Sequence, residues 1–232
     1  MTEVRIVPLT GIPEVAEGDD LAGLLGDAVE RGGGLWVGDV IVVAQKVVSK
    51  AEGRVAHVPE QQHVEAVLAE TARVRRRRDE FIVAETRHGF VCASAGVDRS
   101  NTPGDDWVVL LPVDPDTSAR ALREALGRRF GVAPAVIITD SFGRAWRQGT
   151  TDVAIGVAGM TALLDLRGQR DARGRELQGT VIAVADELAG AAELVMGKAR
   201  NVPAALIRGY VVPPGEGTAH ELVMPPERDL FP

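Results

Sequence analysis

Runs of β-branched and other apolar residues recur along the chain and are bounded by glycine, proline and charged residues. Runs of this kind are typical of short strands that lie inside a protein. The pattern predicts strands at residues 4–7, 39–45, 81–85, 89–93, 107–111, 135–139, 181–184 and 204–208. The pair at 81–85 and 89–93 is expected to form a hairpin that turns at Arg87, His88 and Gly89.

Other segments place apolar residues three or four positions apart, which indicates one buried face of a helix. The first such helix is expected from Asp19 or Asp20 to Glu30, where a run of three glycines follows. Further helices are expected at 61–73, from a cap at Asp116 or Thr117 to residue 130, and at 186–198.

Strands and helices alternate without a strict βαβ rhythm, which favours an α+β architecture over a doubly wound sheet. The sequence contains no Gly-x-x-x-x-Gly-Lys-Ser/Thr loop and no dinucleotide fingerprint, so a P-loop or Rossmann fold is not expected. There is no internal repeat and no clean linker, so residues 1–232 are expected to form a single unit. Two prolines and a glycine keep 8–14 irregular, and the proline-rich tail from Pro213 is expected to be irregular too.

The composition is that of a globular protein: 232 residues, of which 45% are hydrophobic and 25% charged. A net charge of −7 argues against nucleic acid as a partner. The single cysteine, Cys92, excludes an intrachain disulfide and lies in an apolar stretch that predicts burial. No signal peptide or membrane span is visible, so a cytoplasmic protein without a membrane partner is expected.

One basic run stands out, Arg73 and residues 75–78. It is read either as the solvated end of a helix or as a patch that attracts an acidic, phosphate-rich ligand.

The segment 137–152 has the clearest chemical content. An apolar strand is expected to end at Asp140 and Ser141, whose oxygens suit a hard cation such as Mg²⁺. Arg144 and Arg147 follow, and guanidinium groups suit phosphates and carboxylates. The alternative is an ordinary capped turn with surface arginines.

Two further segments offer polar groups near strand ends or turns. Asp98 lies in a turn where it could share a metal with Asp140, and Asn101 offers an amide to a base or ribose. Gln45 and Lys50 follow a buried strand, and a lysine there could contact phosphate. Taken alone, the first segment is better explained as an ordinary turn and the second as a solvated lysine.

Together these segments resemble one family, the coenzyme F420-0:L-glutamate ligases. The similar motifs occur in order over nearly the whole chain: PLTGIP at 8–13, QKVVSKAEG at 45–53, ETRHGFVC at 85–92, AGVDRSN at 95–101, TDSFGRAWRQGTT at 139–151, ADELA at 185–189 and MGK at 196–198. One departure is Gln45, where some members carry serine.

The resemblance implies an α+β homodimer of two intertwined subdomains that uses GTP with Mg²⁺ or Mn²⁺, and K⁺ as a further candidate. Its substrates would be coenzyme F420-0 and L-glutamate. It implies Asp98, Asp140 and Ser141 as metal ligands. It implies Ile12, Pro13, Glu14, Val15, Gln45, Lys50 and Asn101 as nucleotide contacts.

The activity implied by the resemblance is amide-bond formation, followed by γ-glutamyl extension. The GTP γ-phosphate would pass to the lactyl carboxylate of F420-0, and the glutamate amine would attack the resulting acyl phosphate. Lys50 and Arg144 would position phosphates, and His88 is a candidate general base.

Two other functions remain open at this point. A metal-dependent phosphohydrolase could use the same acids, and a non-catalytic module could bind the cofactor alone. The paired acids count against the second alternative, because a passive flavin-like pocket needs no metal.

Overall fold

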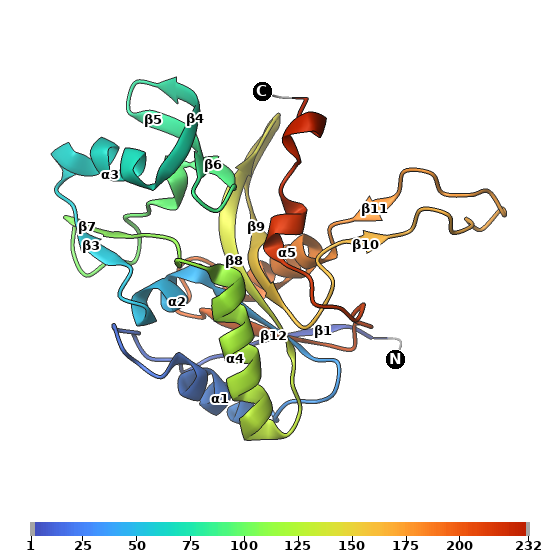
Figure 1. Cartoon of the computed structure of the whole chain (residues 1–232). Coiled ribbons are helices and arrows are strands. Elements are labelled where there is room, and N and C mark those ends of the chain that lie inside the picture. The colour runs from blue at the N-terminus through green and yellow to red at the C-terminus, as the bar shows by residue number, and fades with distance from the viewer. Residues whose placement is uncertain (1–2, 231–232) are drawn as a thin grey trace.

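The computed structural model describes residues 3–230 and has an α+β fold, as predicted. Figure 1 shows its helices and strands around one central sheet. The strands are β1 (Arg5–Pro8), β2 (Val40–Ala44), β3 (Val55–His57), β4 (Thr71–Arg78), β5 (Phe81–Thr86), β6 (Val91–Ala93), β7 (Trp107–Val109), β8 (Ala135–Arg144), β9 (Arg147–Ala158), β10 (Leu164–Asp165), β11 (Val181–Ile182) and β12 (Ala204–Arg208). The helices are α1 (Leu21–Arg31), α2 (Gln45–Ala51), α3 (His63–Glu70), α4 (Pro115–Phe130) and α5 (Val184–Met196), with short 3-10 helices at Glu60–Gln62, Ser94–Gly96, Ala219–Leu222 and Pro226–Arg228.

The central sheet has five strands in the order β1-β12-β2-β8-β9. Two of its three inner strands, β2 and β8, run parallel, with Val42 opposite Ile137 and Ala44 opposite Thr139, and all other neighbours are antiparallel. β2 and the first four residues of β8 are Val, Ile and Ala that are almost all fully buried, as expected for strands covered on both faces. Because β2 and β8 are parallel, their carboxyl ends meet at one edge of the sheet.

Helices cover this sheet and complete the main core. α4 packs against β8 and β9, while α5 packs against β9, β12 and β1. α1 packs in turn against α4 (Figure 1). Burial of the apolar faces of these helices is the main source of stability in such an arrangement.

A second, smaller core lies beside the main one. The sheet β4-β5-β6 and the pair β3-β7 surround it together with α3. Its buried residues are Val58, Val67, Ile82, Ala84, Ala95, Val97 and Val108. The connection from α2 into β3 and the return through β7 join the smaller core to the larger one.

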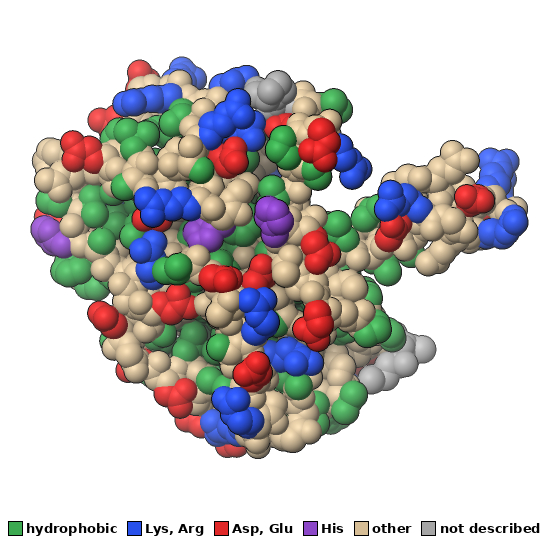
Figure 2. Space-filling view, in the orientation of Figure 1, with side chains coloured by type: hydrophobic (Ala, Val, Ile, Leu, Met, Phe, Trp, Pro, Cys, Tyr) green, Lys and Arg blue, Asp and Glu red, His purple; other side chains and the backbone are tan. Residues whose placement is uncertain are grey.

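Two hairpins extend from the body. β8 and β9 continue as a ribbon beyond the region that the helices cover (Figure 1). The chain between β10 and β11 forms a long arm, and Figure 2 shows Lys or Arg side chains gathered at its tip.

Most predicted elements are confirmed, but the helix expected at 61–73 ends at Glu70. The arginine run is therefore not a helix end: it forms β4, an edge strand paired with β5. Arg75 of this run is largely buried and forms ion pairs with Glu85 and Asp229. Pairing with β5 overrides the local helical pattern, which the sequence pattern alone cannot show.

Three other boundaries differ from the prediction. α4 is capped by Asp114, whose carboxylate accepts hydrogen bonds from the Thr117 amide and hydroxyl, and not by Asp116 or Thr117. β8 does not end before Asp140 but continues to Arg144, because β9 pairs with it along its whole length. α5 begins at Val184, so Asp186 lies inside its first turn.

No helix was predicted for the segment after β2, and the structure forms the helix α2 there. Among residues 3–230, no helix is both long and apolar enough to cross a bilayer.

The fold generates a prediction at Gly156 in β9. A Cβ at this position would lie closer than 3.0 Å to the Pro115 carbonyl at the start of α4. We expect Gly156→Ala to lower the free energy of unfolding by about 1–3 kcal/mol, since overpacking forces the helix away from the sheet. Urea denaturation followed by circular dichroism measures this change.

Gly179→Ala is the matched control, because no atom lies within 4 Å of its added Cβ. Equal unfolding midpoints for the two variants would contradict the close approach of α4 to β9.

Candidate functional site

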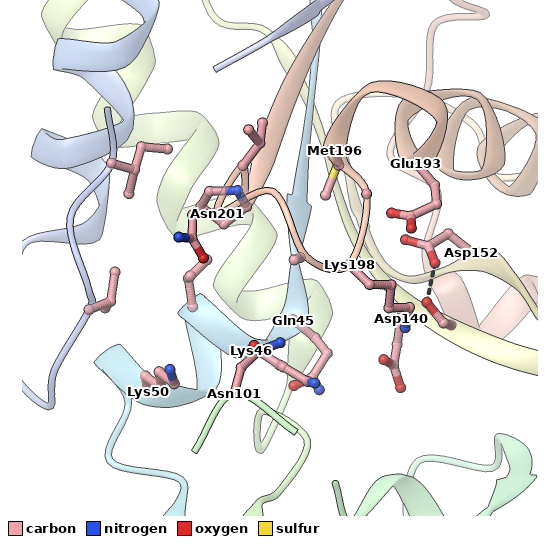
Figure 3. A pocket seen from close by; sticks show the side chains of 18 of the residues that line it. Gln45, Lys46, Lys50, Asn101, Asp140, Asp152, Glu193, Met196, Lys198 and Asn201 are labelled. Atoms are coloured by element: carbon pink, nitrogen blue, oxygen red, sulfur yellow. Dashed lines mark hydrogen bonds between the residues drawn. The ribbon is translucent and has the colours of Figure 1, made fainter. Parts of the chain in front are cut away.

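A pocket with a volume of about 340 Å³ opens at the edge of the sheet where β2 and β8 end or leave the core. Figure 3 shows its walls: the loop before α1, the helix α2, the turn at Asn101, the start of the β8–β9 ribbon and the end of α5. Its lining residues are Ile12, Pro13, Glu14, Val15, Ala44, Gln45, Lys46, Val47, Lys50, Asn101, Asp140, Ser141, Asp152, Glu193, Met196, Gly197, Lys198, Asn201, Val202 and Pro203.

α2 brings polar side chains to the wall of this pocket. Gln45 is only 1% exposed, and its Oε1 accepts a hydrogen bond from the Ser49 hydroxyl. Its Nε2 has no hydrogen-bond partner within residues 3–230. Buried amide groups are nearly always paired, so this donor indicates a ligand or water that accepts from it in the pocket.

Lys50, one turn further along α2, is 7% exposed and forms an ion pair with Glu14. Glu14 belongs to the irregular loop 8–14 and is itself mostly exposed. The lysine is therefore fixed at the pocket wall, while its partner can move away into solvent. A phosphate could replace that carboxylate, because both are anions.

The turn that carries Asp98 is tied to α2 by Lys46. The Lys46 Nζ lies 2.8 Å from the Asp98 carboxylate and also donates to the Ser100 carbonyl and hydroxyl. Asp98 also exchanges two backbone hydrogen bonds with Val109. Burial would raise the pKa of Asp98, but the hydrogen bond and charge of Lys46, with the Ser100 amide, hold the pKa of this carboxyl below its usual range.

Acidic side chains gather on the opposite wall. Asp140 and Ser141 come from β8, Asp152 from β9 and Glu193 from α5 (Figure 3). Asp152 is 5% exposed and accepts hydrogen bonds from the hydroxyls of Ser141 and Thr139. These bonds hold the Ser141 side chain against Asp152.

The acids repel one another. Burial raises the pKa of Asp140 to about 6, and the charges of Asp98 and Asp152 add to the rise. The pKa of Glu193 is also raised, first by burial and then by Asp152. The positive charge of Lys198 lowers the pKa values of Asp140 and Glu193, but both remain above their usual range.

The donor set fits a hard divalent cation. Among residues 3–230, no three His, Cys, Asp or Glu side chains stand close enough to enclose a metal ion. Mg²⁺, however, is usually held by one or two carboxylates, with phosphate and water oxygens as the other ligands. Asp140 and Ser141 border the pocket and fit this mode, whereas Asp98 lies outside the lining and acts on Asp140 through its charge.

The structure brings most predicted site residues together. All of the predicted nucleotide contacts line the pocket, together with Asp140 and Ser141. Asp98 does not line the pocket, but it forms an ion pair with Lys46, which does. Arg144 lies elsewhere, exposed near the tip of the β8–β9 ribbon, where its Nη2 donates to the Gln148 carbonyl.

His88 and Cys92 are placed in structural roles. The His88 Nε2 lies 2.9 Å and 3.2 Å from the carbonyl oxygens of Pro112 and Val113, and the ring stacks on Phe90. His88 does not line the pocket, so it is poorly placed as a general base. Cys92 is buried as predicted, and burial together with the charge of Asp140 raises the pKa of its thiol to about 12.

Sequence reasoning missed several pocket residues, namely Lys46, Asp152, Glu193, Lys198 and Asn201. Asp152 could have been found from the sequence. In a hairpin, residues at equal distances before and after the turn lie opposite one another. Asp152 is the cross-strand neighbour of Ser141. Glu193 and Asn201 depend on how α5 packs, for which the sequence gives no local signal.

The nucleotide-sized pocket with acids on one wall and lysines on the other is typical of enzymes that handle phosphorylated substrates. Comparison with known proteins is consistent with this class. The family model described as F420-0:Gamma-glutamyl ligase matches residues 11–209, and the chain belongs to this family.

Similar proteins include the coenzyme F420:L-glutamate ligase of Methanothermobacter thermautotrophicus, 44% identical over 255 aligned positions that cover 98% of each chain. The corresponding ligase of Methanopyrus kandleri is 42% identical over 98% of this chain and 97% of its own. That of Methanocaldococcus jannaschii is 40% identical over 84% of each chain.

The raised pKa of Asp140 predicts a dependence of stability on pH. The pKa is about 6 in the folded protein and about 3.9 in an unfolded chain, so between these values the folded protein binds more protons. At pH 7.5, in the presence of a chelator, we expect Asp140→Asn to be more stable than the unsubstituted protein by roughly 1–3 kcal/mol. This advantage should shrink as the pH falls through about 6 towards 4.

Urea denaturation at a series of pH values measures the difference. An advantage of Asp140→Asn that stays constant from pH 7.5 to pH 4.5 would show that Asp140 is ionised without cost in the fold.

Proposed function

We propose that the protein is a GTP-dependent coenzyme F420-0:L-glutamate ligase that acts in coenzyme F420 biosynthesis. The observation that carries the proposal is the single pocket in which a buried amide donor, a buried lysine and paired acids converge. The names of the relatives, all coenzyme F420:L-glutamate ligases, supply the substrates.

The nucleotide occupies the side of the pocket formed by the loop 12–15 and α2. Gln45 Nε2 and the Asn101 amide are the groups that can read a base or ribose, since each offers hydrogen bonds to the pocket. When the nucleotide binds, a phosphate replaces Glu14 as the ion-pair partner of Lys50, and the lysine thereby positions the phosphate chain. Lys46 and Lys198 add positive charge near the same phosphates.

The metal, Mg²⁺ or Mn²⁺, belongs on the acidic wall, held by Asp140, Ser141 and Asp98. When bound it would neutralise charge on the phosphoryl group that is transferred. Asp152 accepts a hydrogen bond from the Ser141 hydroxyl and so fixes the position of this side chain. K⁺ is a further candidate cation.

The chemistry follows from the substrates. A carboxylate is a poor acyl donor, so the acceptor carboxylate of F420-0 first takes the γ-phosphoryl group of GTP and becomes an acyl phosphate. The amine of glutamate then attacks that carbonyl and inorganic phosphate leaves. Later glutamates join through the γ-carboxylate of the previous one. Pre-positioning of the charged groups by the pocket supplies most of the catalysis in such transfers.

The two alternative functions, a phosphohydrolase and a binding module, differ from a ligase in the reaction they would carry out. A phosphohydrolase releases phosphate from the nucleotide without glutamate, and a passive binding module turns over nothing. The acids with raised pKa values favour a site built for a cation, and thus for a reaction on phosphate.

The deciding experiment incubates the protein with F420-0, GTP, Mn²⁺ and L-glutamate and follows the acceptor by mass spectrometry. We expect a gain of one or more glutamyl units with release of one phosphate per unit. We also expect a higher kcat/KM with GTP than with ATP.

Asp140→Ala should reduce ligation by at least about a hundredfold, as expected when a charge that stabilises the transition state is removed. The control is Asp105→Ala, an exposed acid outside the pocket. Phosphate release that does not need glutamate would favour the phosphohydrolase instead.

Metal binding gives a second prediction. A cation that binds only the folded protein stabilises it by RT ln(1 + c/Kd) at a free cation concentration c, so the melting temperature rises with the cation concentration. We expect Mn²⁺ to raise the Tm of the protein, and we expect Asp98→Asn and Asp140→Asn each to remove most of that rise. Differential scanning fluorimetry over a range of Mn²⁺ concentrations measures it, with Asp105→Asn as the control. If both pocket variants keep the full rise, the metal lies elsewhere.

The family resemblance also leads us to include a homodimer in the proposal. Sedimentation velocity at several protein concentrations tests that part separately.

A further inference from the structure

The β8–β9 ribbon leads directly from the acidic wall to an exposed tip. Ser141 pairs with Asp152 at the pocket, and the pairing continues through Phe142 and Gly143 to Arg144, which lies opposite Arg147. Trp146 forms the turn with a left-handed backbone (φ 56°) and is 80% exposed. A large aromatic side chain that is this exposed at a hairpin tip offers a flat apolar surface to a ligand.

Strand geometry places a row of side chains along one face of β8. Thr139 and Ser141 both donate to Asp152, so they point to the same face. Since side chains alternate along a strand, Asp140 and Phe142 belong to the other face. The pairing with β9 shifts register between Gly143 and Arg144, so Arg144 follows this row at the irregular end of the strand. The rise of about 3.3 Å per residue sets Arg144 about 13 Å from Asp140 along the strand.

The row is apolar in its middle and cationic at its end. Phe142 is half-buried and its ring packs edge-to-face on Phe90, with ring centroids 6.3 Å apart. Beyond it, Gly143 leaves open space, since no atom lies within 4 Å of an added Cβ.

At the end of the ribbon, Arg144 and Arg147 face each other across the strands. Like charges directly opposite in a hairpin destabilise it. Neither arginine has an ion pair with an acid within residues 3–230, and Arg144 has only a long hydrogen bond to Gln148. A bound anion would relieve this repulsion.

We infer that this face of the ribbon is the acceptor subsite, and that it binds the anionic, aromatic part of the substrate. The inference rests on the proposed function. The carboxylate of F420-0 lies at Asp140 and its metal, the phosphodiester of the same molecule is held by Arg144, and the flat deazaflavin ring stacks on Trp146. The order of groups along the ligand (carboxylate, phosphodiester, ring) is the order of acid, arginine and tryptophan along the ribbon.

This assignment separates the two phosphate-bearing substrates. Lys50 and α2 serve the nucleotide on one side of the acids, and Arg144 serves the acceptor on the other side. Arg144 is therefore a binding residue for the acceptor and not a contact of the GTP phosphates.

The test is a pair of equilibrium titrations by deazaflavin fluorescence, in the presence of GDP and Mn²⁺ so that no transfer takes place. One probe is F420-0, and the other is the deazaflavin ribityl alcohol that lacks the phospholactyl group. The variants are Arg144→Gln, Trp146→Ala and Trp146→Phe. The controls are Arg173→Gln, on the β10–β11 arm, and Trp36→Phe, beyond the opposite end of β2.

We expect Trp146→Ala to raise the Kd of both probes about tenfold, as loss of a stacking partner does, and Trp146→Phe to restore part of the affinity. We expect Arg144→Gln to raise the Kd of F420-0 about tenfold and to leave that of the ribityl alcohol unchanged. The Kd of GDP and both controls should stay as in the unsubstituted protein.

Unchanged affinity for F420-0 in both variants, with the unsubstituted protein active as a ligase, would overturn the subsite and leave the function standing. A rise in Kd of equal size for both probes in Arg144→Gln would show that Arg144 shapes the ribbon and does not hold the phosphodiester. If the unsubstituted protein neither binds F420-0 nor adds glutamate to it, the proposed function fails and the subsite fails with it.

Discussion

The parallel pairing of β2 and β8 at the centre of the sheet is the constraint on which the site depends. β2 and the first half of β8 are apolar and buried, and their register sets Ala44 opposite Thr139. The next residues of the two strands are Gln45 and Asp140, so the main polar groups of the pocket emerge side by side. In an antiparallel pair, the two strand ends would lie at opposite edges of the sheet. The pocket is thus a direct result of strand direction, in the way that open α/β sheets place their ligands at strand carboxyl ends.

Beyond that edge the two strands continue differently, and each leads to a different wall of the pocket. β2 stops and turns into α2, whose side chains Gln45 and Lys50 are held rigidly because they are almost fully buried. β8 continues into the ribbon with β9, which brings Asp152 behind Ser141. Lys46 then links α2 to the turn of Asp98, which belongs to the strands around the smaller core. One ion pair therefore couples the two cores at the place where the metal is proposed to bind.

The sequence predicted the inner strands well, because an uninterrupted β-branched run has few other stable conformations. It also predicted that the loop 12–15, Gln45, Lys50 and Asn101 belong to one site, through the resemblance to a family. It failed where long-range pairing decides the structure. Residues 71–73 were expected to continue a helix but belong to the strand that pairs with β5, and β8 extends past Asp140 because β9 is its partner. For the same reason Glu193 and Lys198 were not recognised, since only the packing of α5 brings them to the pocket.

The contact between Lys50 and Glu14 has a consequence for how the pocket responds to salt. In the absence of a ligand, this cation already has a counter-anion supplied by the chain itself. An entering phosphate exchanges one negative neighbour of Lys50 for another, so few dissolved ions are released or taken up at this point. Attraction between exposed charges weakens strongly as ionic strength rises, but an exchange of this kind is nearly neutral to it. The proposed nucleotide side of the pocket should thus keep its affinity in concentrated salt.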